Sequence, residues 1–508
     1  MSRINTNVQS LIAQRVLGQN NNGLNTSLER LATGLRINRG KDDPSGLIAS
    51  ENLRAEQAGL TAALKNAERA DQVVNIAEGG LNEVNGLLTE LQGLVTASAN
   101  TAGLSAEEKE ANQLQIDSIL QTIDRIAGAT SFQGTKLLNG NFDFSVNSVN
   151  GAVSSFKVNG AKLDFGGTRD VEVVVTQSAQ RAGLFLSAGG TALDLGSAGE
   201  TFVIEVTGSK GSRQFSFASG TALTTVAATI NSFTDVLGVS ATATAAATGV
   251  DLFSTEFGSD EFVSVKVVDA GAFAPANTGV YTYTATDTNT VNTGSGVAFA
   301  SATNKITDEG QNVSATINGQ IATTNGTHAR VNTDFLDVEI DITDANAQAV
   351  GNFTAFTITG GGAEFQLAGN VDIAGKVALG IQNVAVRELG KVEDSSVNYT
   401  LQDVGAGKAL NLVDGDLSVA QKVISEAIKN VSQLRGRLGA FQSNTVGATV
   451  RSLGIALENT AAAESVIRDA DFATETASLT RSQILAASAQ NTLQQANFQP
   501  QNVLQLLG

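Results

Sequence analysis

Residues 60–95 read LTAALKNAERADQVVNIAEGGLNEVNGLLTELQGLV, and apolar side chains recur in this stretch every seven residues. The first series is Leu60, Ala67, Val74, Leu81, Leu88 and Val95, and a second series between them is Ala63, Ala70, Ala77, Val84 and Leu91. Such a heptad seam is typical of a coiled coil. We predict one helix from about Ser45 to Ser98. At 1.5 Å per residue it is roughly 80 Å long and needs equally long partners.

Two further segments supply those partners. Ser105 and Glu108 have the spacing of a capping box, and behind them Ile116, Ile119, Ile123 and Ile126 keep a helical spacing. A third heptad series includes Ala420, Ile424, Ala427, Val431, Leu434, Leu438, Phe441, Thr445, Ala448, Ser452 and Ile455. We therefore predict a rod of three long helices whose seam includes Leu60, Ala67, Val74, Leu81, Leu88, Val95, Val431, Leu434, Leu438 and Phe441.

The two ends of the chain are apolar and almost free of charge. Arg15 is the one charged residue between Ile4 and Leu28, and none follows Arg481, although the formal net charge is -18. Apolar stripes recur within both ends, and the first is interrupted at Gly18 to Gly23. We predict that they cover one another between copies of the chain through Val8, Leu11, Ile12, Val16, Leu24, Leu28, Leu31, Leu35, Ile484, Leu485, Leu493, Val503, Leu504 and Leu507. Identical copies can stack there without bringing like charges together. The pattern indicates a polymer.

Composition excludes several other functions. The absence of cysteine rules out a disulfide framework, a thiolate metal site and a cysteine nucleophile. With 32 Lys and Arg against 50 Asp and Glu, the chain lacks the positive charge typical of nucleic-acid binding, and adsorption to an anionic membrane is disfavoured. No stretch of 18 apolar residues and no signal-peptide pattern is present, so we expect neither membrane insertion nor a cleaved signal peptide.

The middle of the chain is rich in Gly, Thr and Val and predicts β-structure. Residues 202–207 and 214–217 flank a turn and predict a hairpin, followed by a short helix at 226–233 and strands at 239–242, 250–253 and 262–268. Further strands are predicted at 313–317, 336–342 and 353–359. The fold class is thus α+β and multidomain, with long coiled-coil helices at both ends and a β-rich central insertion.

Several motifs make the resemblance to a known family specific. They are Ile4–Asn7, Leu28–Asn38, Lys41–Asp43, Leu81–Val84, Arg435–Ala440, Ala463–Ser465, Ile467–Ala473 and Pro500–Leu507. On these motifs the chain resembles the bacterial flagellins, the subunits of the flagellar filament. The β-β-α-β-β order in the centre also resembles the small flagellin hook IN module.

The resemblance implies a domain organisation. Terminal helices, D0, are expected from 1–43 with 460–508, the helical rod, D1, from 44–150 with 391–459, and a variable surface region like D2 and D3 from 151–390. This last region is expected to form two subdomains, about 151–305 and 306–390. Pro44 and Lys41–Asp43 are expected at the joint between the terminal helices and the rod.

The resemblance also implies an export route and a set of partner proteins. Flagellins are exported unfolded by the flagellar type III apparatus and become extracellular, and an export chaperone holds their C-terminal arm. They polymerise beneath a filament cap, and hook-associated proteins adjoin the filament. Flagellins sensed by Toll-like receptor 5 carry arginines at the positions of Glu90 and Gln92, while Leu94 matches, so weak recognition is expected here.

Other functions are less consistent with the sequence. A hook-filament junction protein, which is hook-associated, is the main alternative because it shares the terminal helices. An enzyme is not expected: the single histidine, His328, lies outside any His-Glu-x-x-His motif, which argues against an inserted zinc protease. Asp337, Glu339 and Asp341 alternate along one strand and could bind Ca²⁺ weakly, but a solvated strand face explains them better. We therefore expect no catalytic residue, no metal and no cofactor.

Overall fold

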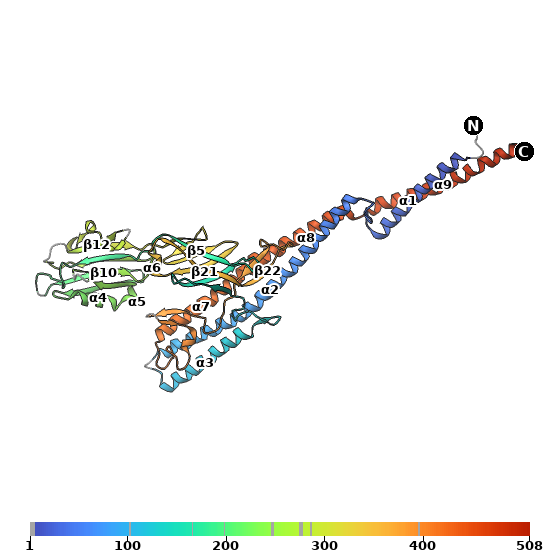
Figure 1. Cartoon of the computed structure of the whole chain (residues 1–508). Helices are drawn as coiled ribbons and strands as arrows, with labels where there is room; N and C mark the ends of the chain where they lie inside the picture. The colour runs from blue at the N-terminus through green and yellow to red at the C-terminus, as the bar shows by residue number, and fades with distance from the viewer. Residues whose placement is uncertain are drawn as a thin grey trace. The chain divides into compact units, whose positions relative to one another are not determined.

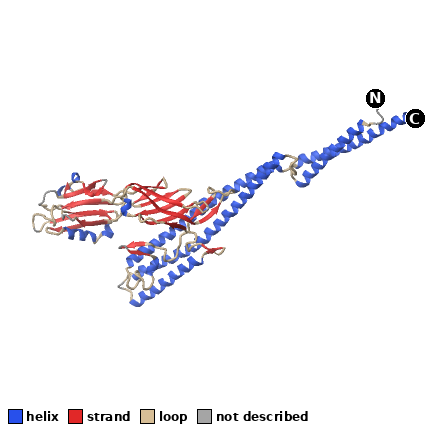
Figure 2. Ribbon diagram, viewed as in Figure 1, coloured by secondary structure: helices blue, strands red, loops and turns tan. Residues whose placement is uncertain are grey.

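The computed structural model describes residues 6–100, 103–164, 166–197, 199–244, 248–273, 278–284, 287–394 and 397–507, and its elements are labelled in Figure 1. The chain folds into two compact units. The first unit comprises residues 1–79, 365–377 and 435–508, and the second comprises residues 80–364 and 378–434. Helices predominate towards both ends of the chain and strands in its middle, as Figure 2 shows, which confirms the predicted fold class.

The helices of the first unit are few and long. They are α1 (Val8–Thr33), the first part of α2 (Pro44–Ser98), the last part of α7 (Leu417–Ala440), a π-helix (Phe441–Val446), α8 (Gly447–Arg468) and α9 (Phe472–Leu507). α2 runs antiparallel to the α7–α8 segment, because Arg435 pairs with Glu78 while Arg468 pairs with Glu51. The predicted interruption at Gly18 to Gly23 is wrong, since α1 is continuous. Each glycine costs about 1 kcal/mol relative to alanine, and packing against α9 offsets it.

The rod seam is buried along α2, α7 and the start of the π-helix. Ala67, Val74, Leu81, Leu88 and Val95 are fully or almost fully buried, whereas Leu60 is only partly buried. In the third helix Val431, Leu434, Leu438 and Phe441 are also buried. This burial gives α2 tertiary support over its 55 residues, a length that helix propensity alone does not stabilise.

Beyond the π-helix, the predicted register is wrong. A regular heptad would place Thr445, Ala448, Ser452 and Ile455 in the seam, but Ala448, Ser452 and Ile455 are exposed, and Thr445 is only partly buried. Val446 and Leu453 are buried instead. A π-turn contains one residue more than an α-helical turn, so every later side chain moves on by one position around the helix. The buried face of α8 is therefore displaced by one residue from the heptad in the sequence.

The second unit contains its own helical part. It combines the later part of α2 with α3 (Ala106–Ala129), the first part of α7 and two short hairpins, β1–β2 (Ser131–Phe132, Thr135–Lys136) and β24–β25 (Val392–Asp394, Val397–Tyr399). The predicted capping box is confirmed, because the Ser105 hydroxyl accepts from the Glu108 N–H and the Glu108 carboxylate accepts from the Ser105 N–H. Ile116, Ile119 and Ile123 are buried.

The β-rich region of the second unit consists of two sandwiches with separate cores. Sandwich A contains a five-stranded sheet in the order β17-β16-β5-β21-β3 and a four-stranded sheet in the order β18-β19-β20-β4. Its strands are β3 (Phe144–Asn147), β4 (Val153–Ala161), β5 (Arg169–Gln177), β16 (Ser314–Ile317), β17 (Gln320–Ile321), β18 (Thr323–Asn325), β19 (His328–Asn332), β20 (Leu336–Ile342) and β21 (Gly351–Gly361). Every pairing within these two sheets is antiparallel.

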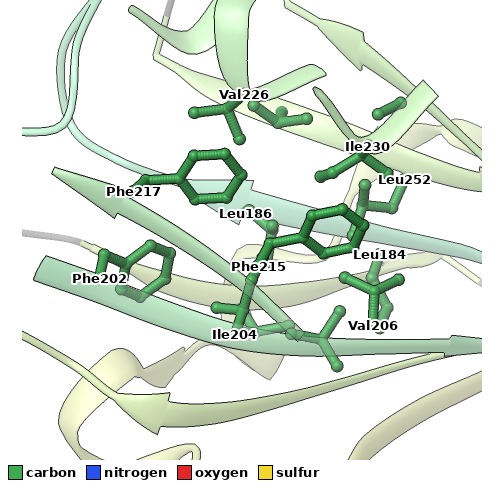
Figure 3. Packing of buried hydrophobic residues seen from close by; sticks show 14 of the residues in the cluster. Leu184, Leu186, Phe202, Ile204, Val206, Phe215, Phe217, Val226, Ile230 and Leu252 are labelled. Carbon is green, nitrogen blue, oxygen red and sulfur yellow. The ribbon is translucent and has the colours of Figure 1, made fainter. Parts of the chain in front are cut away.

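Sandwich B is formed by the chain between β5 and β16. Its core lies between a sheet ordered β13-β12-β6-β10-β9, a sheet ordered β15-β11-β7-β8, and helix α4 (Leu223–Asn231) (Figure 3). The strands are β6 (Gly183–Ser187), β7 (Thr201–Gly208), β8 (Ser212–Ala218), β9 (Val239–Ala243), β10 (Gly249–Ser254), β11 (Phe262–Asp269), β12 (Gly279–Thr284), β13 (Asp287–Val291), β14 (Val297–Ala298) and β15 (Ile306–Glu309). The predicted hairpin is confirmed as β7–β8, with Phe202 opposite Phe217.

The two subdomains do not follow the predicted division at 305 and 306. β4 and β5, which precede sandwich B in sequence, pair with β20, β16 and β21, which follow it. Sandwich B is therefore an insertion within sandwich A. Changes in residue composition along the chain cannot show this insertion, because the pairing of distant strands is a tertiary property.

Candidate self-assembly surface

The helices α1 and α9 form an antiparallel pair in the first unit, which we call the terminal helix pair. Asn7 donates from Nδ2 to the Ala496 carbonyl at 2.7 Å, and Asn20 donates to the Leu485 carbonyl at 3.2 Å. Asn7 also caps α1, because its side chain accepts from the Ser10 N–H. These hydrogen bonds align the two ends of the chain, although the residues they join are more than 460 positions apart in sequence.

Small side chains fill the interface of the terminal helix pair. The buried residues described there are Ser10, Ala13, Ser27, Ala486, Ala489 and Ala496. Small residues allow two helices to approach closely, but each buries little apolar area. The sequence prediction missed these positions because it followed the larger Leu, Ile and Val side chains; alanine recurring at helical spacing in α9 was the available signal.

The large apolar side chains lie elsewhere on the pair. Val8, Leu11, Ile12, Val16, Leu28, Ile484 and Leu485 are exposed, and so are Phe472 and Phe498, which the prediction did not include. Leu24, Leu31, Leu35 and Leu493 are partly buried. The side chains of Val503, Leu504 and Leu507 lie outside the described residues. The pair thus carries an apolar surface that no other part of the described chain covers.

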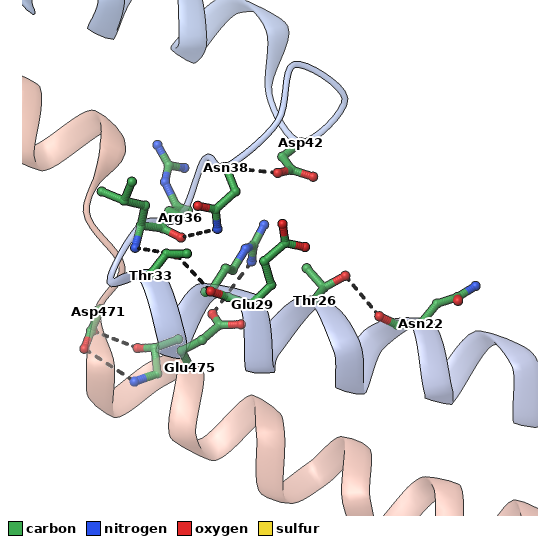
Figure 4. Close-up of polar contacts among 12 residues, drawn as sticks. Asn22, Thr26, Glu29, Thr33, Arg36, Asn38, Asp42, Asp471 and Glu475 are labelled. Carbon is green, nitrogen blue, oxygen red and sulfur yellow. Dashed lines mark hydrogen bonds and ion pairs between the residues drawn. The ribbon is translucent and has the colours of Figure 1, made fainter.

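A compact joint links the terminal helix pair to α2 and α8 (Figure 4). Gly34 ends α1 in the left-handed conformation, with φ of 74°. The two connectors then pair like short antiparallel strands: the Arg36 N–H donates to the Arg468 carbonyl at 2.7 Å, and the Ala470 N–H donates to the Gly34 carbonyl at 2.9 Å. The Arg36 guanidinium adds a 2.6 Å hydrogen bond to the Ile467 carbonyl.

Carboxylates stabilise the turns of this joint. Asp42 accepts from the backbone N–H groups of Arg39 and Asn38, and these bonds hold its pKa below the usual value. Asp471 accepts from the hydroxyl and the N–H of Thr474, which likewise lowers the pKa of Asp471. Arg30 pairs with Glu475 across the two helices at 3.7 Å. The acidic residues here have structural partners and are arranged as turn and helix caps.

The carboxylates on β20 that were considered as calcium ligands pair with side chains of the neighbouring strand β19. Arg330 on β19 contacts Asp337 at 3.4 Å and Glu339 at 3.2 Å. His328 lies at the start of β19, and its Nδ1 is 2.6 Å from Oδ1 of Asp341, a hydrogen bond that raises the pKa of His328. Among the residues that the structure describes, no group of three or more His, Cys, Asp or Glu side chains is arranged to hold a metal ion. The described helices include none with the length and apolarity needed to cross a membrane.

Comparison with known proteins connects this geometry to a family. The model of the bacterial flagellin N-terminal helical region matches residues 4–143, and that of the C-terminal helical region matches residues 421–507. Flagellin B of Helicobacter pylori is 29% identical over 528 residues, with 99% of each chain covered. A flagellin of Salmonella choleraesuis is 27% identical over 540 residues, with the same coverage.

A solved structure shows only a distant likeness. FliC of Burkholderia pseudomallei is 14% identical, covers 74% of this chain and 99% of that chain, and has a TM-score of 0.24, which is too low to support a conclusion. The two family regions match the two helical ends, and the named relatives extend over the whole chain. This chain belongs to the bacterial flagellins.

Proposed function

We propose that copies of this chain polymerise through the terminal helix pair into the flagellar filament, as its structural subunit. The observation that carries the proposal is the distribution of side-chain size on this pair: its buried residues are Ala and Ser, while most of its large apolar side chains are exposed and the others are only partly buried. A protein that works as a monomer normally has the opposite arrangement. The relatives that cover the whole chain are named flagellins, which favours a filament subunit over a hook-associated protein.

The energetics of the pair support the proposal. Full burial of a Leu, Ile or Val side chain contributes about 1.5–3 kcal/mol, so covering several exposed side chains on each copy supplies a substantial driving force. The pair carries little charge, because Arg15 is the only charged residue in α1 before Glu29 and Arg481 is the last one in α9. Stacked copies therefore meet little electrostatic repulsion there, although each carries a formal charge of -18.

Point variants of the full chain test this proposal. Leu11→Ser and Ile484→Ser change exposed side chains, so we expect the monomer to keep its circular dichroism spectrum and its melting temperature. Polymerisation from sheared filament seeds should require at least about tenfold more protein, which corresponds to about 1.4 kcal/mol lost per added subunit. Ile321→Ser, at an exposed position on β17 of sandwich A, is the matched control. Growth of the Leu11 and Ile484 variants at the wild-type concentration would contradict the proposal.

We extend the proposal to export and partners on the basis of family membership. The chain is exported unfolded through the flagellar type III apparatus and reaches the extracellular filament, an export chaperone binds its C-terminal arm, and the filament cap and hook-associated proteins adjoin the polymer. Flagellins are structural proteins, and we propose no catalytic role and no cofactor for this chain. Purification of the full chain from the cytosol of the producing cell with no chaperone bound to it would contradict the chaperone part of the proposal.

We also propose weak recognition by Toll-like receptor 5. Glu90 is exposed on α2, and Gln92 and Leu94 beside it are partly buried. The first two positions carry a negative and a neutral side chain where recognised flagellins carry arginine. A buried Arg anchor at an interface is worth about 2 kcal/mol or more, and its loss lowers affinity at least about thirtyfold. Purified monomer applied to receptor reporter cells tests this, and potent signalling would refute it.

A further inference from the structure

A polar cleft lies where the chain passes from sandwich A into sandwich B and back. The outgoing segment after β5 pairs with the returning segment before β16, because the N–H groups of Gln180 and Gln311 each donate to the carbonyl of the other residue at 2.9 Å. The cleft beside this double connection has a volume of about 700 Å³ and is lined by residues of both sandwiches, which belong to the second unit. This size is typical of small-molecule sites.

Hydroxyl and amide side chains make up most of the cleft wall. Asn312 is held in place, because its Oδ1 accepts from the N–H groups of Ser259 and Gly326 at 3.0 Å and 2.8 Å. The side chains of Gln180 and Thr282, by contrast, form no hydrogen bond with another described residue, although both are partly buried. These two side chains can therefore donate to and accept from a ligand that enters the cleft.

Asp308 adds a strong acceptor to the wall. One of its carboxylate oxygens accepts from the Gly183 N–H at 2.8 Å, and the other forms no hydrogen bond with a described residue. Burial and, to a smaller extent, the neighbouring Glu309 carboxylate raise the pKa of Asp308. Since burial removes water from this carboxyl group, hydroxyl donors of a ligand would restore the hydrogen bonds that it lacks.

Tyr283 on β12 forms an aromatic part of the wall. Its ring stacks on the Phe253 ring with centroids 5.0 Å apart, and its hydroxyl donates to Asp251. Gly183 leaves room for this stack, because a Cβ atom there would lie 2.6 Å from the Phe253 ring and 2.9 Å from the Tyr283 ring. The tyrosine is thus fixed on the sheet, and its ring can pack against the C–H groups of a sugar ring.

The charges around the cleft exclude other classes of ligand. Arg181 is the one cationic side chain among the described residues that line it. Arg181 already pairs with Asp344 at 3.2 Å and lies 4.5 Å from the centre of the Phe257 ring. Asp308 and Glu309 carry negative charge on the wall and repel an anionic ligand. An uncharged ligand rich in hydroxyl groups fits this lining best.

We propose that the cleft between the two sandwiches binds a neutral oligosaccharide. Gln180, Thr282 and Asp308 form hydrogen bonds with the hydroxyl groups of the ligand, and Tyr283 packs against a sugar ring. The inference goes beyond polymerisation and does not depend on it, because every residue of the cleft belongs to the sandwiches or to the connections between them. It gives the central insertion a binding function of its own.

Saturation-transfer difference NMR with the unpolymerised full chain tests the inference. The probes are cellotetraose, chitotetraose and lacto-N-tetraose, which represent plant, fungal and animal glycans, and 3′-sialyllactose is the anionic comparison. We expect at least one neutral probe to bind with a Kd of about 5 mM or lower, and 3′-sialyllactose to bind more weakly. Absence of binding by all three neutral probes at about 20 mM would overturn the inference. Tighter binding of 3′-sialyllactose than of every neutral probe would also overturn it.

Two variants of the full chain locate the binding in the cleft. Gln180→Ala removes an unbonded amide, and Asp308→Asn keeps an acceptor for the Gly183 N–H, so both should retain the circular dichroism spectrum and melting temperature of the wild type. Each should weaken binding at least about fivefold, as expected for the loss of one hydrogen bond. Gln320→Ala, which removes an exposed amide on β17 opposite Ile317, is the matched control and should bind like the wild type. Wild-type affinity in both cleft variants would contradict this site and leave the proposed function intact.

Discussion

Three alanine variants near the π-helix distinguish the buried positions seen in the structure from those that the heptad pattern of the sequence predicts. Leu438 and Ile455 both belong to the heptad series, whereas Leu453 does not. In the structure Leu438 is 0% exposed and Leu453 is 9% exposed, while Ile455 is 61% exposed. The heptad pattern by itself therefore predicts that changes at Leu438 and Ile455 are costly. The structure predicts that changes at Leu438 and Leu453 are costly.

The expected magnitudes follow from burial. Replacing a buried Leu by Ala removes its transfer free energy and leaves a cavity, at a cost of about 2–5 kcal/mol. Leu438→Ala should fall within this range, and Leu453→Ala towards its lower end, because Leu453 retains some exposure. A substitution at an exposed site away from caps and pairs usually changes stability by less than about 0.5 kcal/mol, so Ile455→Ala should be almost neutral in the monomer.

Urea unfolding of unpolymerised protein, followed by far-ultraviolet circular dichroism, measures these differences. The comparison requires equal m-values, so that a shift in midpoint reports a change in stability. Leu114→Ala, at an exposed position on α3, controls for the loss of an apolar side chain from a helix surface. The reasoning would be refuted if Ile455→Ala lost as much free energy of unfolding as Leu453→Ala, because the π-turn would then not displace the seam.

Three further changes test separate parts of the molecule. His328→Gln should remove a stabilisation of sandwich A that is present below the unfolded-state pKa of about 6.5 and is lost as pH rises through the higher folded-state pKa. At 39% exposure of the His328 side chain the effect should be about 1 kcal/mol or less, so melting temperatures of variant and wild type at pH 6 and pH 8 should converge at the higher pH. Ser105→Ala should cost about 1 kcal/mol through loss of the α3 cap; Ser105→Asp should restore most of it in urea unfolding, and equal loss in both variants would argue against capping. Gly34→Ala should cost on the order of 1 kcal/mol because alanine disfavours the left-handed conformation, and hydrogen exchange should show faster opening at Arg36 and Ala470 than in a Gly18→Ala control.

Local patterns in the sequence were sufficient for much of the rod and for the character of the ends. The heptad through Val74, Leu81 and Leu88 predicted a long helix because coiled-coil packing requires that period, and these side chains are buried. The capping box at Ser105 and the hairpin around residues 208–212 were predicted because both depend on residues close in sequence. The assignment of the exposed apolar residues to self-assembly remains a prediction.

Other features depended on contacts that no local pattern contains. Sandwich B lies within sandwich A because β5 pairs with β16 and β21 across more than 130 residues. No local sequence pattern predicts that pairing. The alanines of α9 that face inward do so because α1 packs closely against α9 at these positions. The exposure of Ile455 depends on a single π-turn held by Gln442 against Asp71 and Asn75. Hydrophobic periodicity is a local property, so the order of the amino acids alone establishes which residues are apolar and how they are spaced. Which of those residues face inward depends on tertiary packing, since one extra residue in a helical turn redirects every side chain after it.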